Sequence, residues 1–480
     1  MDKVAIIMDI FPYVNMLLAI VIIFIEKRNV STTLTWLMVL FFIPILGFIL
    51  YFVFGQNLHK QKIFTFKKEE DNVLKKYMLR NKELVESSKT YLSEEMEDFK
   101  KMINMFINHN QAAFSENNIV EIYTNGDDKF KALLEAIDNS KKQIHIDYYA
   151  IKSDGIGTQF RDALVKKAKE GVEVKLLYDQ LGSRMLRKSF FKPLVEAGGK
   201  YAVFFPSILK VINFRLNYRN HRKIAIIDNN IGFIGGFNIG DEYLGKNKKF
   251  GFWRDTHIKI EGGAVSSLQL RFLLDWRYAT KEIIDLNLNQ FNLPEYFGNI
   301  GMQIVSSGPD SEWEYIKYGF LSMIENAKEN IYIQTPYLIL DDSIRESLKI
   351  AAISGVNIKI MIPNKPDHPF VYWATYYNAG DLLRAGVKVY TYEKGFLHSK
   401  TIVVDKKVTS VGTSNMDIRS FKLDFEVNAF IYNKKTAAKL AVLFEEDLND
   451  CIELTTEKYN NRGIIIKLKE SISRLLSPIL

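Results

Sequence analysis

Two stretches of this chain follow one pattern: His221-Arg-Lys-Ile-Ala-Ile-Ile-Asp228 with Gly235-Gly-Phe-Asn238, and His398-Ser-Lys-Thr-Ile-Val-Val-Asp405 with Gly412-Thr-Ser-Asn415. A histidine, a lysine, an aspartate, a glycine and an asparagine keep the same spacing in both copies. Five fixed positions that recur in the same order are improbable by chance. The sequence therefore predicts a duplicated structural unit with one motif in each half.

The residues after each histidine are rich in isoleucine, valine and threonine, and such a short apolar run predicts a β-strand. Side chains on a strand alternate between two faces, so His221 and Lys223 share a face, as do His398 and Lys400. The asparagine that follows after a turn and a second strand can return to the same cluster. One motif thus offers an imidazole, an ammonium and an amide, and these groups suit phosphate oxygens.

Phosphodiester chemistry needs more than a single motif provides. One imidazole can act as a nucleophile on phosphorus, but the departing alkoxide also needs a proton from an acid. A single copy lacks that acid, whereas two copies that face each other supply both groups. We therefore expect His221 and His398 to converge on one phosphorus atom.

The duplicated pattern resembles the HKD motif of the phospholipase D superfamily. Within it the chain is similar to the bacterial cardiolipin synthases over nearly its whole length, most specifically at residues 219–223, 233–243, 253–257, 412–421 and 425–427. Alternating strand and helix patterns around the motifs indicate an α/β fold. We therefore expect two homologous phospholipase D-like lobes, each a mixed sheet flanked by helices, that form a pseudo-twofold catalytic core.

The resemblance implies transfer of a phosphatidyl group between two phosphatidylglycerol molecules, which gives cardiolipin and glycerol through a phosphohistidine. By the family's assignment, His221 is the nucleophile and His398 is the general acid and base. The phosphoryl oxygens would be held by Lys223, Lys400, Asn238 and Asn415. A membrane phospholipase D that hydrolyses the same bond, an HKD nuclease and a non-catalytic scaffold are the alternatives.

Carboxylates complete the predicted site. A carboxylate behind each catalytic histidine fixes its tautomer, and Asp255 and Glu426 follow the two motifs at the position for this role. Asp228 and Asp405 belong to the signature, and they either take part in catalysis, organise the turn after the strand or pair with the motif lysine. Gly236 stands where many superfamily members carry serine, so the two half-sites are not identical.

Composition narrows the chemistry. Cys451 is the only cysteine, which excludes an intramolecular disulfide and a cysteine-cluster zinc site. The seven histidines show neither H-x-x-x-H nor H-E-x-x-H spacing, so a protein-bound metal is not implied. The reaction that the resemblance implies calls for no other cofactor. A net charge of +8 fits anionic lipid as well as nucleic acid. The apolar N-terminal segments favour phosphatidylglycerol and anionic membrane lipids as partners over nucleic acid, and they do not decide whether the chain is a homo-oligomer.

The chain divides into predicted parts at changes in composition. These parts are residues 1–57 with apolar segments at about 4–25 and 33–54, a polar helical connector at 58–117, a first lobe at 118–295, a second lobe at 296–455 and an amphipathic tail at 456–480. The connector is read as a solvated spacer. The tail either lies in the lipid headgroup plane or packs on a lobe.

The two apolar segments predict a transmembrane hairpin, because about 20 apolar residues span a bilayer. The loop between them carries Lys27 and Arg28, whereas Lys3 and a cluster of lysines at 60–68 flank the outer ends. Since positive charge stays on the cytoplasmic side, both termini and the catalytic lobes are expected at the cytoplasmic face of the cell membrane, in a multi-pass protein.

Overall fold

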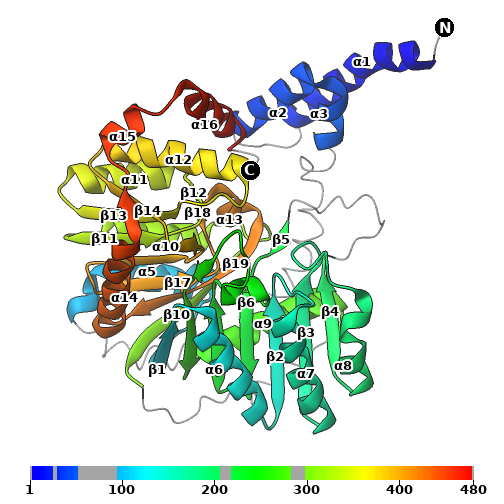
Figure 1. Cartoon of the computed structure of the whole chain (residues 1–480), viewed down its shortest axis with the longest axis vertical. Helices are drawn as coiled ribbons and strands as arrows, with labels where there is room; N and C mark the ends of the chain where they lie inside the picture. The colour runs from blue at the N-terminus through cyan, green and yellow to red at the C-terminus, as the bar shows by residue number, and fades with distance from the viewer. Residues whose placement is uncertain (1–2, 25–29, 52–93, 206–217, 283–297, 478–480) are drawn as a thin grey trace.

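The structure, a computed structural model, describes residues 3–24, 30–51, 94–205, 218–282 and 298–477 (Figure 1). Two lobes share one 16-stranded mixed sheet. They meet where β1 (Phe114–Tyr123) pairs antiparallel with β10 (Ile300–Ser307). The first of these strands begins four residues before the predicted start of the lobe. The predicted boundary between the lobes, at 295, lies outside the described residues.

Strand order is the same in both lobes, except that β20 (Cys451–Glu453) adds one strand at the outer edge of the second lobe. Outward from β1 come β9 (His257–Glu261), β7 (Ile231–Gly235), β6 (Lys223–Ile227), β2 (Gln143–Tyr148), β3 (Glu173–Asp179) and β4 (Lys200–Phe204). Outward from β10 come β19 (Asp424–Tyr432), β17 (Val408–Gly412), β16 (Thr401–Val404), β11 (Asn330–Gln334), β13 (Asn357–Pro363), β14 (Lys388–Tyr392) and β20 (Cys451–Glu453). The match confirms the predicted α/β fold of two repeated lobes.

Helices cover the sheet and form the cores with it. The helices of the first lobe are α6 (Gly126–Asn139), α7 (Gly155–Lys169), α8 (Lys192–Glu196) and α9 (Ala264–Thr280). Those of the second lobe are α10 (Tyr315–Glu325), α11 (Asp342–Ile353), α12 (Pro369–Leu383), α13 (Ile418–Lys422) and α14 (Lys434–Asp447). One buried apolar cluster contains Trp276 of α9 and Phe444 of α14 together with strand residues of both lobes. The two lobes therefore bury part of their apolar surface in common.

The motif strands end in turns that the aspartates organise. Asp228 and Asp405 each adopt a positive φ, 53° and 51°, in the turn between two paired strands. The Asp228 carboxylate accepts hydrogen bonds from the backbone N–H groups of residues 141–143, and the Asp405 carboxylate from those of residues 328–330. Each carboxylate thus ties the hairpin turn to the start of the neighbouring strand.

Short strands join the lobes a second time. β5 (Arg219–Asn220), which leads into the first motif, pairs parallel with β19 of the second lobe. β15 (Gly395–Leu397), which leads into the second motif, pairs parallel with β8 (Phe252–Arg254) of the first lobe. The chain that carries each motif histidine is therefore held by backbone hydrogen bonds to the opposite lobe.

The end of the connector differs from the predicted solvated spacer. Residues 94–110 are helical, and Met102, Ile103 and Phe106 are buried in the core of the second lobe. Gln303 of β10 donates hydrogen bonds to the carbonyl oxygens of Ile103 and Ala112. These three apolar residues near the end of the connector are thus core residues of the second lobe, whereas the connector up to residue 93 lies outside the described residues.

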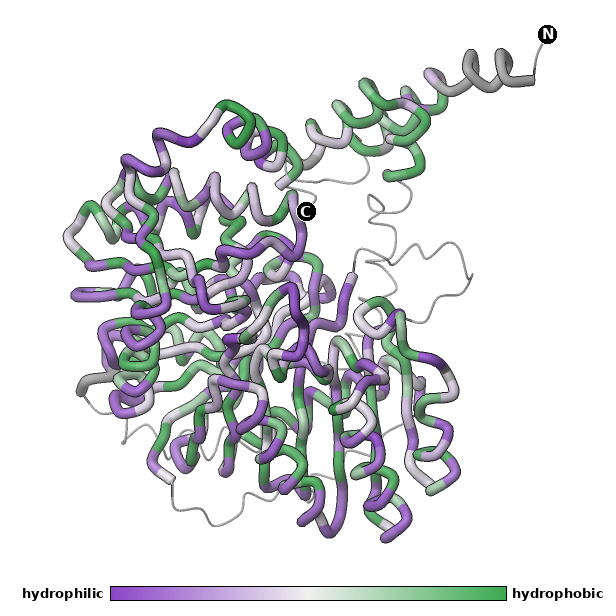
Figure 2. Tube along the Cα trace, viewed as in Figure 1, coloured by the Kyte–Doolittle hydropathy of each residue, from purple (hydrophilic) through white to green (hydrophobic). Residues whose placement is uncertain are grey.

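The predicted apolar segments form helices α1 (Lys3–Phe24), α2 (Val30–Phe42) and α3 (Pro44–Leu50), and Figure 2 shows mostly hydrophobic residues with a few polar ones along their coloured part. Pro44 lacks an N–H, so the carbonyl of Leu40 loses its helical partner and the helix breaks there. Asn15 of α1 donates hydrogen bonds to the carbonyl oxygens of Leu40 and Pro44. In the described residues, no helix combines the length and the hydropathy required for a membrane crossing.

The C-terminal tail forms α15 (Thr456–Asn460) and α16 (Ile464–Leu476), and α16 packs on α12. The packed side is polar: the buried Glu470 carboxylate accepts hydrogen bonds from Arg462 and from the Tyr459 hydroxyl. The opposite side is apolar and exposed, and it consists of Ile464, Ile465, Leu468, Ile472 and Leu475. The polarity of this helix is therefore the reverse of that of an ordinary surface helix.

Replacement of Asp405 tests whether this aspartate serves the fold. We expect Asp405→Ala to lower the free energy of unfolding by about 2–4 kcal/mol, because three backbone N–H groups lose a charged acceptor. Asp405→Asn keeps one acceptor oxygen, so its free energy of unfolding should lie between those of Asp405→Ala and the wild type. Urea unfolding of the purified chain in detergent measures this, and activity per folded molecule should stay near that of the wild type. An inactive Asp405→Ala protein with unchanged stability would instead assign Asp405 to catalysis.

Candidate active site

The backbone places the two motif histidines in equivalent positions. The His221 N–H donates to the carbonyl oxygen of Phe425 at 3.0 Å, as a continuation of the pairing between β5 and β19. The His398 N–H donates to the carbonyl oxygen of Arg254 at 2.7 Å, beyond the pairing of β15 with β8. The backbone of each histidine is thus bound to a residue of the other lobe, and the next residue along that lobe's chain is the candidate carboxylate, Glu426 or Asp255.

The carboxylates are exchanged between the lobes. Nδ1 of His221 lies 2.9 Å from Oε1 of Glu426, and Nδ1 of His398 lies 2.6 Å from Oδ2 of Asp255. The sequence nominated both carboxylates but gave no sign that each serves the histidine of the opposite motif. Because a carboxylate accepts, Nδ1 of each imidazole carries the proton and Nε2 is left as the reactive nitrogen. Nζ of Lys400 also lies 3.0 Å from Nδ1 of His398, but the shorter contact with Asp255 sets the tautomer.

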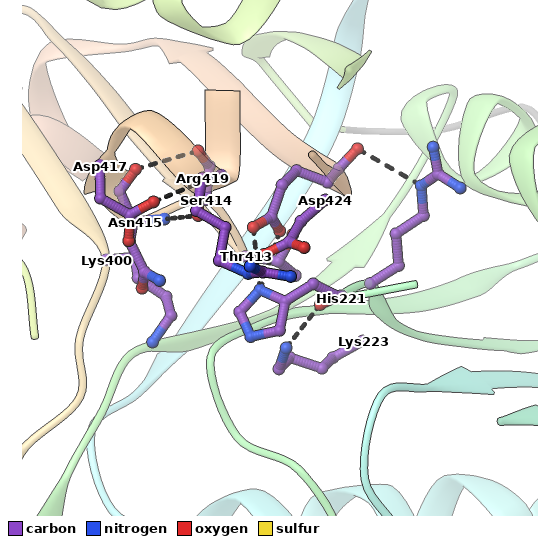
Figure 3. A network of polar contacts seen from close by, with 12 residues as sticks. His221, Lys223, Lys400, Thr413, Ser414, Asn415, Asp417, Arg419 and Asp424 are labelled. Atoms are coloured by element: carbon purple, nitrogen blue, oxygen red, sulfur yellow. Dashed lines mark hydrogen bonds and ion pairs between the residues drawn. The ribbon is translucent and has the colours of Figure 1, made fainter. Parts of the chain in front are cut away.

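Both motif lysines are buried, and Figure 3 shows Lys223 beside His221. Nζ of Lys223 donates to the carbonyl oxygen of His221, and Nζ of Lys400 donates to that of His398. Burial lowers the pKa of Lys223 to about 7 and that of Lys400 to about 8, against partial compensation by the nearby carboxylates. A phosphate bound beside these lysines would favour their charged forms.

The two half-sites share one electrostatic environment. Burial lowers the pKa of His221 well below its usual value, and the positive charges of Lys223, Lys400 and His398 act in the same direction. Burial also lowers the pKa of His398, with contributions from both lysines, while Asp255 opposes the shift. Charged groups of the second lobe therefore act on the histidine of the first lobe, and charged groups of the first lobe act on the histidine of the second. This is expected for two halves of one site.

Aromatic side chains flank the imidazoles. The Tyr149 ring lies edge-on to His221 with 4.9 Å between ring centroids, and Trp253 lies 5.2 Å from His398. Phe396 stacks near His398 at 6.1 Å. These walls reduce access of water to the reactive nitrogens, and the sequence offered no motif that would have identified them.

The two asparagines are placed differently. Asn238 is held by the protein, because its Oδ1 accepts from the Ala150 N–H and its Nδ2 donates to the Tyr243 hydroxyl. Asn415 is buried near Lys400 (Figure 3), and its Oδ1 has no hydrogen-bond partner among the described residues. Their role in phosphate binding stays a prediction. Asp228 and Asp405 lie at the opposite ends of the motif strands from the lysines and bind backbone N–H groups there.

The substitution of Gly236 for serine has a steric reason. A Cβ at this position would lie 1.9 Å from Oδ1 of Asp255, so a side chain here would displace the carboxylate that holds His398. The equivalent position in the second lobe is Thr413, whose hydroxyl accepts from the Val427 N–H beside Glu426. The two half-sites therefore differ at this position: the first has no room for a side chain beside Asp255, whereas the second holds a threonine beside Glu426.

Two ion pairs, one buried and one half-buried, support the site and were missed from the sequence. Arg222 of the first motif pairs with Asp275 of α9 at 2.7 Å, and Arg254 pairs with Asp447 of α14 at 2.7 Å. The second pair joins the lobes. The sequence does contain a pattern that could have indicated these pairs: the last helix of each repeat carries one of the two aspartates near its C-terminal end. The described residues contain no cluster of three or more metal-ligating side chains.

A duplicated HKD pattern on a two-lobed sheet, with both histidines at one site, defines a phospholipase D-like enzyme. The family model described as "Cardiolipin synthase, PLD-like domain" matches residues 133–258 and 320–448, and the model "Phospholipase_D-nuclease N-terminal" matches residues 14–56. The chain belongs to the cardiolipin synthase family, an enzyme family of the phosphatidyltransferase type.

Relatives match the chain from end to end. It is 53% identical over 479 residues to the major cardiolipin synthase ClsA of Bacillus subtilis (strain 168), with 99% of each chain covered. The cardiolipin synthase of Oceanobacillus iheyensis is 50% identical over 97% of each chain, and that of Staphylococcus aureus (strain Mu50) is 51% identical over 97% of this chain and 95% of its own. The solved structure of a phosphatidylserine synthase from Haemophilus influenzae Rd KW20 shares the fold, with a TM-score of 0.60 at 15% identity over 80% of this chain and all of its own.

Removal of one charge tests the exchanged carboxylates. We expect Glu426→Gln to lower kcat by about 10²–10⁴-fold, because the amide no longer holds the required tautomer of His221. Glu445→Gln, an exposed residue of α14, is the matched control and should be neutral. Steady-state rates with thermal unfolding as a folding check measure this. Full activity of folded Glu426→Gln would contradict the assignment.

The site also predicts a bell-shaped dependence of kcat/KM on pH. The nucleophilic histidine must be neutral, so activity should rise with pH through a pKa below 6.5. His398 must carry a proton to act as the acid, so activity should fall again as the pH passes the lowered pKa of His398. The lysines must also be charged to bind phosphate, so the loss continues at about 7 to 8, where Lys223 and Lys400 lose their protons. A rate profile between pH 5 and 9 measures both limbs, which belong to the coupled site as a whole. A monotonic profile would contradict this account.

Proposed function

We propose that this chain transfers a phosphatidyl group from one phosphatidylglycerol to another, which gives cardiolipin and glycerol. The observation that carries the proposal is the pair of imidazoles, each oriented through Nδ1 by a carboxylate of the other lobe. This arrangement presents two reactive Nε2 atoms to one site that also contains two lysines. Relatives named cardiolipin synthase at 50–53% identity support the choice of substrate and product.

In the first step, Nε2 of His221 attacks phosphorus, and His398 gives its proton to the departing glycerol oxygen. In the second step, His398 takes the proton of the incoming primary hydroxyl, whose oxygen displaces the phosphatidyl group from His221. The proton and the phosphodiester are both conserved. The lower pKa of His221 favours it as the neutral nucleophile, while Asp255 at 2.6 Å favours the proton on His398.

Stabilisation of the transition state falls to the cations. As the phosphoryl group becomes five-coordinate, charge grows on its free oxygens, and Lys223 and Lys400 are already in place to receive it. Asn238 and Asn415 are proposed to contribute their amide N–H groups. The reaction exchanges one phosphodiester for another, so it is reversible and needs no nucleotide, and no metal or other cofactor is assigned to it.

The substrate class agrees with a membrane setting. The apolar helices α1–α3 and the C-terminal helix α16 both lie at the upper end of the molecule in Figure 1. The exposed apolar side of α16 is accompanied by Lys467, Lys469 and Arg474, a pattern that suits an anionic bilayer surface. We propose that the N-terminal segments form a transmembrane hairpin in the cell membrane, with the catalytic lobes on its cytoplasmic side.

Product analysis tests the proposed reaction. Purified chain given only phosphatidylglycerol with a labelled headgroup should release labelled glycerol and form cardiolipin in equal amounts. His221→Ala should abolish both products and the acid-labile labelled protein that a phosphohistidine produces with acyl-labelled lipid. Glu445→Gln again serves as the control.

Other products would redirect the assignment. Glycerol with phosphatidic acid in place of cardiolipin would make the chain a hydrolase of the same bond. Cleavage of nucleic acid without any lipid product would make it a nuclease.

A further inference from the structure

The proposed reaction requires a second anion site. The acceptor phosphatidylglycerol carries its own phosphate, separated from the attacking hydroxyl by one glycerol. That phosphate cannot occupy the position between the histidines, because the donor phosphorus is there. A cationic group at about the length of a glycerol from His221 would therefore be needed, and such a group lies on the strands that hold this histidine.

The register of β5 and β19 places two more charged residues beside the catalytic pair. Arg219 is the Cα partner of Asp424, two residues before His221 and Glu426 respectively. Because strand side chains alternate, Arg219 shares the side of His221, and Asp424 shares the side of Glu426. Asn220, which lies between Arg219 and His221, points to the other side, because its side chain donates a hydrogen bond to Asp147 of the first lobe. Two strand residues span about 6.6 Å, which is comparable to a glycerol bridge.

A second guanidinium comes from α13. Nε of Arg419 lies 3.4 Å from Oδ2 of Asp424, and Figure 3 shows both residues beside His221. Burial lowers the pKa of Arg219, and the positive charge of Arg419 lowers it further, so the two guanidinium groups lie near each other. The carboxylates of Asp424 and Asp179 also act on Arg219. Planar guanidinium groups are suited to phosphate.

Asp424 also has an unused acceptor. Its Oδ1 is buried and has no hydrogen-bond partner in the described part of the chain. A buried carboxylate oxygen without a donor is costly, so a ligand that brings a hydroxyl would be favoured there. Phosphate alone would be repelled by this oxygen, whereas a glycerol phosphate offers both a hydroxyl donor and an anion.

We propose that Arg219, Arg419 and Asp424 form the subsite for the headgroup of the acceptor lipid. The two arginines bind the acceptor phosphate, and Oδ1 of Asp424 accepts a hydrogen bond from the secondary hydroxyl of the headgroup glycerol. The primary hydroxyl then lies at the phosphohistidine. Its oxygen forms the new P–O bond, the bond between phosphorus and Nε2 of His221 breaks, and the proton passes to His398. This subsite rests on the proposed transferase reaction and explains why a lipid alcohol is used in preference to water.

Two acceptors separate this subsite from the catalytic centre. Phosphatidylglycerol as acceptor needs the arginines, whereas free glycerol, which has no phosphate, does not. Labelled glycerol supplied with unlabelled phosphatidylglycerol is exchanged into the lipid headgroup by the same two chemical steps. We therefore expect Arg419→Gln and Arg219→Gln to lower cardiolipin formation by about tenfold or more, while the rate of glycerol exchange changes less than about threefold. Arg419→Lys keeps a positive charge and should recover part of the cardiolipin activity.

The controls make each outcome decisive. Arg345→Gln, on the surface of α11 and paired with Asp342, should alter neither rate. Retained glycerol exchange also shows that the variants are folded. Equal losses with both acceptors, in protein that unfolds at the wild-type temperature, would overturn the subsite. A wild-type chain that forms no cardiolipin but exchanges or hydrolyses the headgroup would instead refute the proposed function.

Discussion

The site depends on hydrogen bonds between each buried imidazole and a carboxylate of the opposite lobe. An imidazolium in an apolar enclosure beside an ammonium group is unfavourable, and both histidines show this as lowered pKa values. Glu426 and Asp255 offset that cost and fix the reactive nitrogen. Because neither lobe contains a complete pair, chemistry on phosphorus requires both lobes in their mutual arrangement.

The fold secures that arrangement in several independent ways. The central antiparallel pairing of β1 with β10 makes one sheet of two repeats. The parallel pairs β5 with β19 and β15 with β8 then fix each histidine backbone against the other lobe. The ion pair between the buried Arg254 and the half-buried Asp447 adds a charged link between the lobes. Loss of one partner of such a pair leaves an uncompensated buried charge, so the interface tolerates little displacement.

Features that depend on a local sequence pattern could be predicted from the sequence. Contacts between residues of the two repeats could not. The apolar run after His221 predicted a strand, and the alternation of side chains along a strand predicted that His221 and Lys223 share a face. The repeated pattern predicted the same arrangement for His398 and Lys400. The exchange of carboxylates between the lobes could not be predicted from the sequence, because Glu426 lies closer in sequence to His398 than to His221, the histidine that it contacts. The burial of Phe106 was likewise hidden, since its partner Phe430 lies more than 300 residues later. The transmembrane hairpin stays a prediction, as do the catalytic roles of the motif residues.

A crystal structure of the chain with orthovanadate tests the central claim most directly, because vanadate adopts the five-coordinate geometry of the transferring phosphoryl group. The account predicts one vanadium atom between Nε2 of His221 and Nε2 of His398, with Glu426 on Nδ1 of the first and Asp255 on Nδ1 of the second. Vanadate bound by the histidine of one lobe alone, or imidazoles that take their Nδ1 partners from their own lobe, would contradict it.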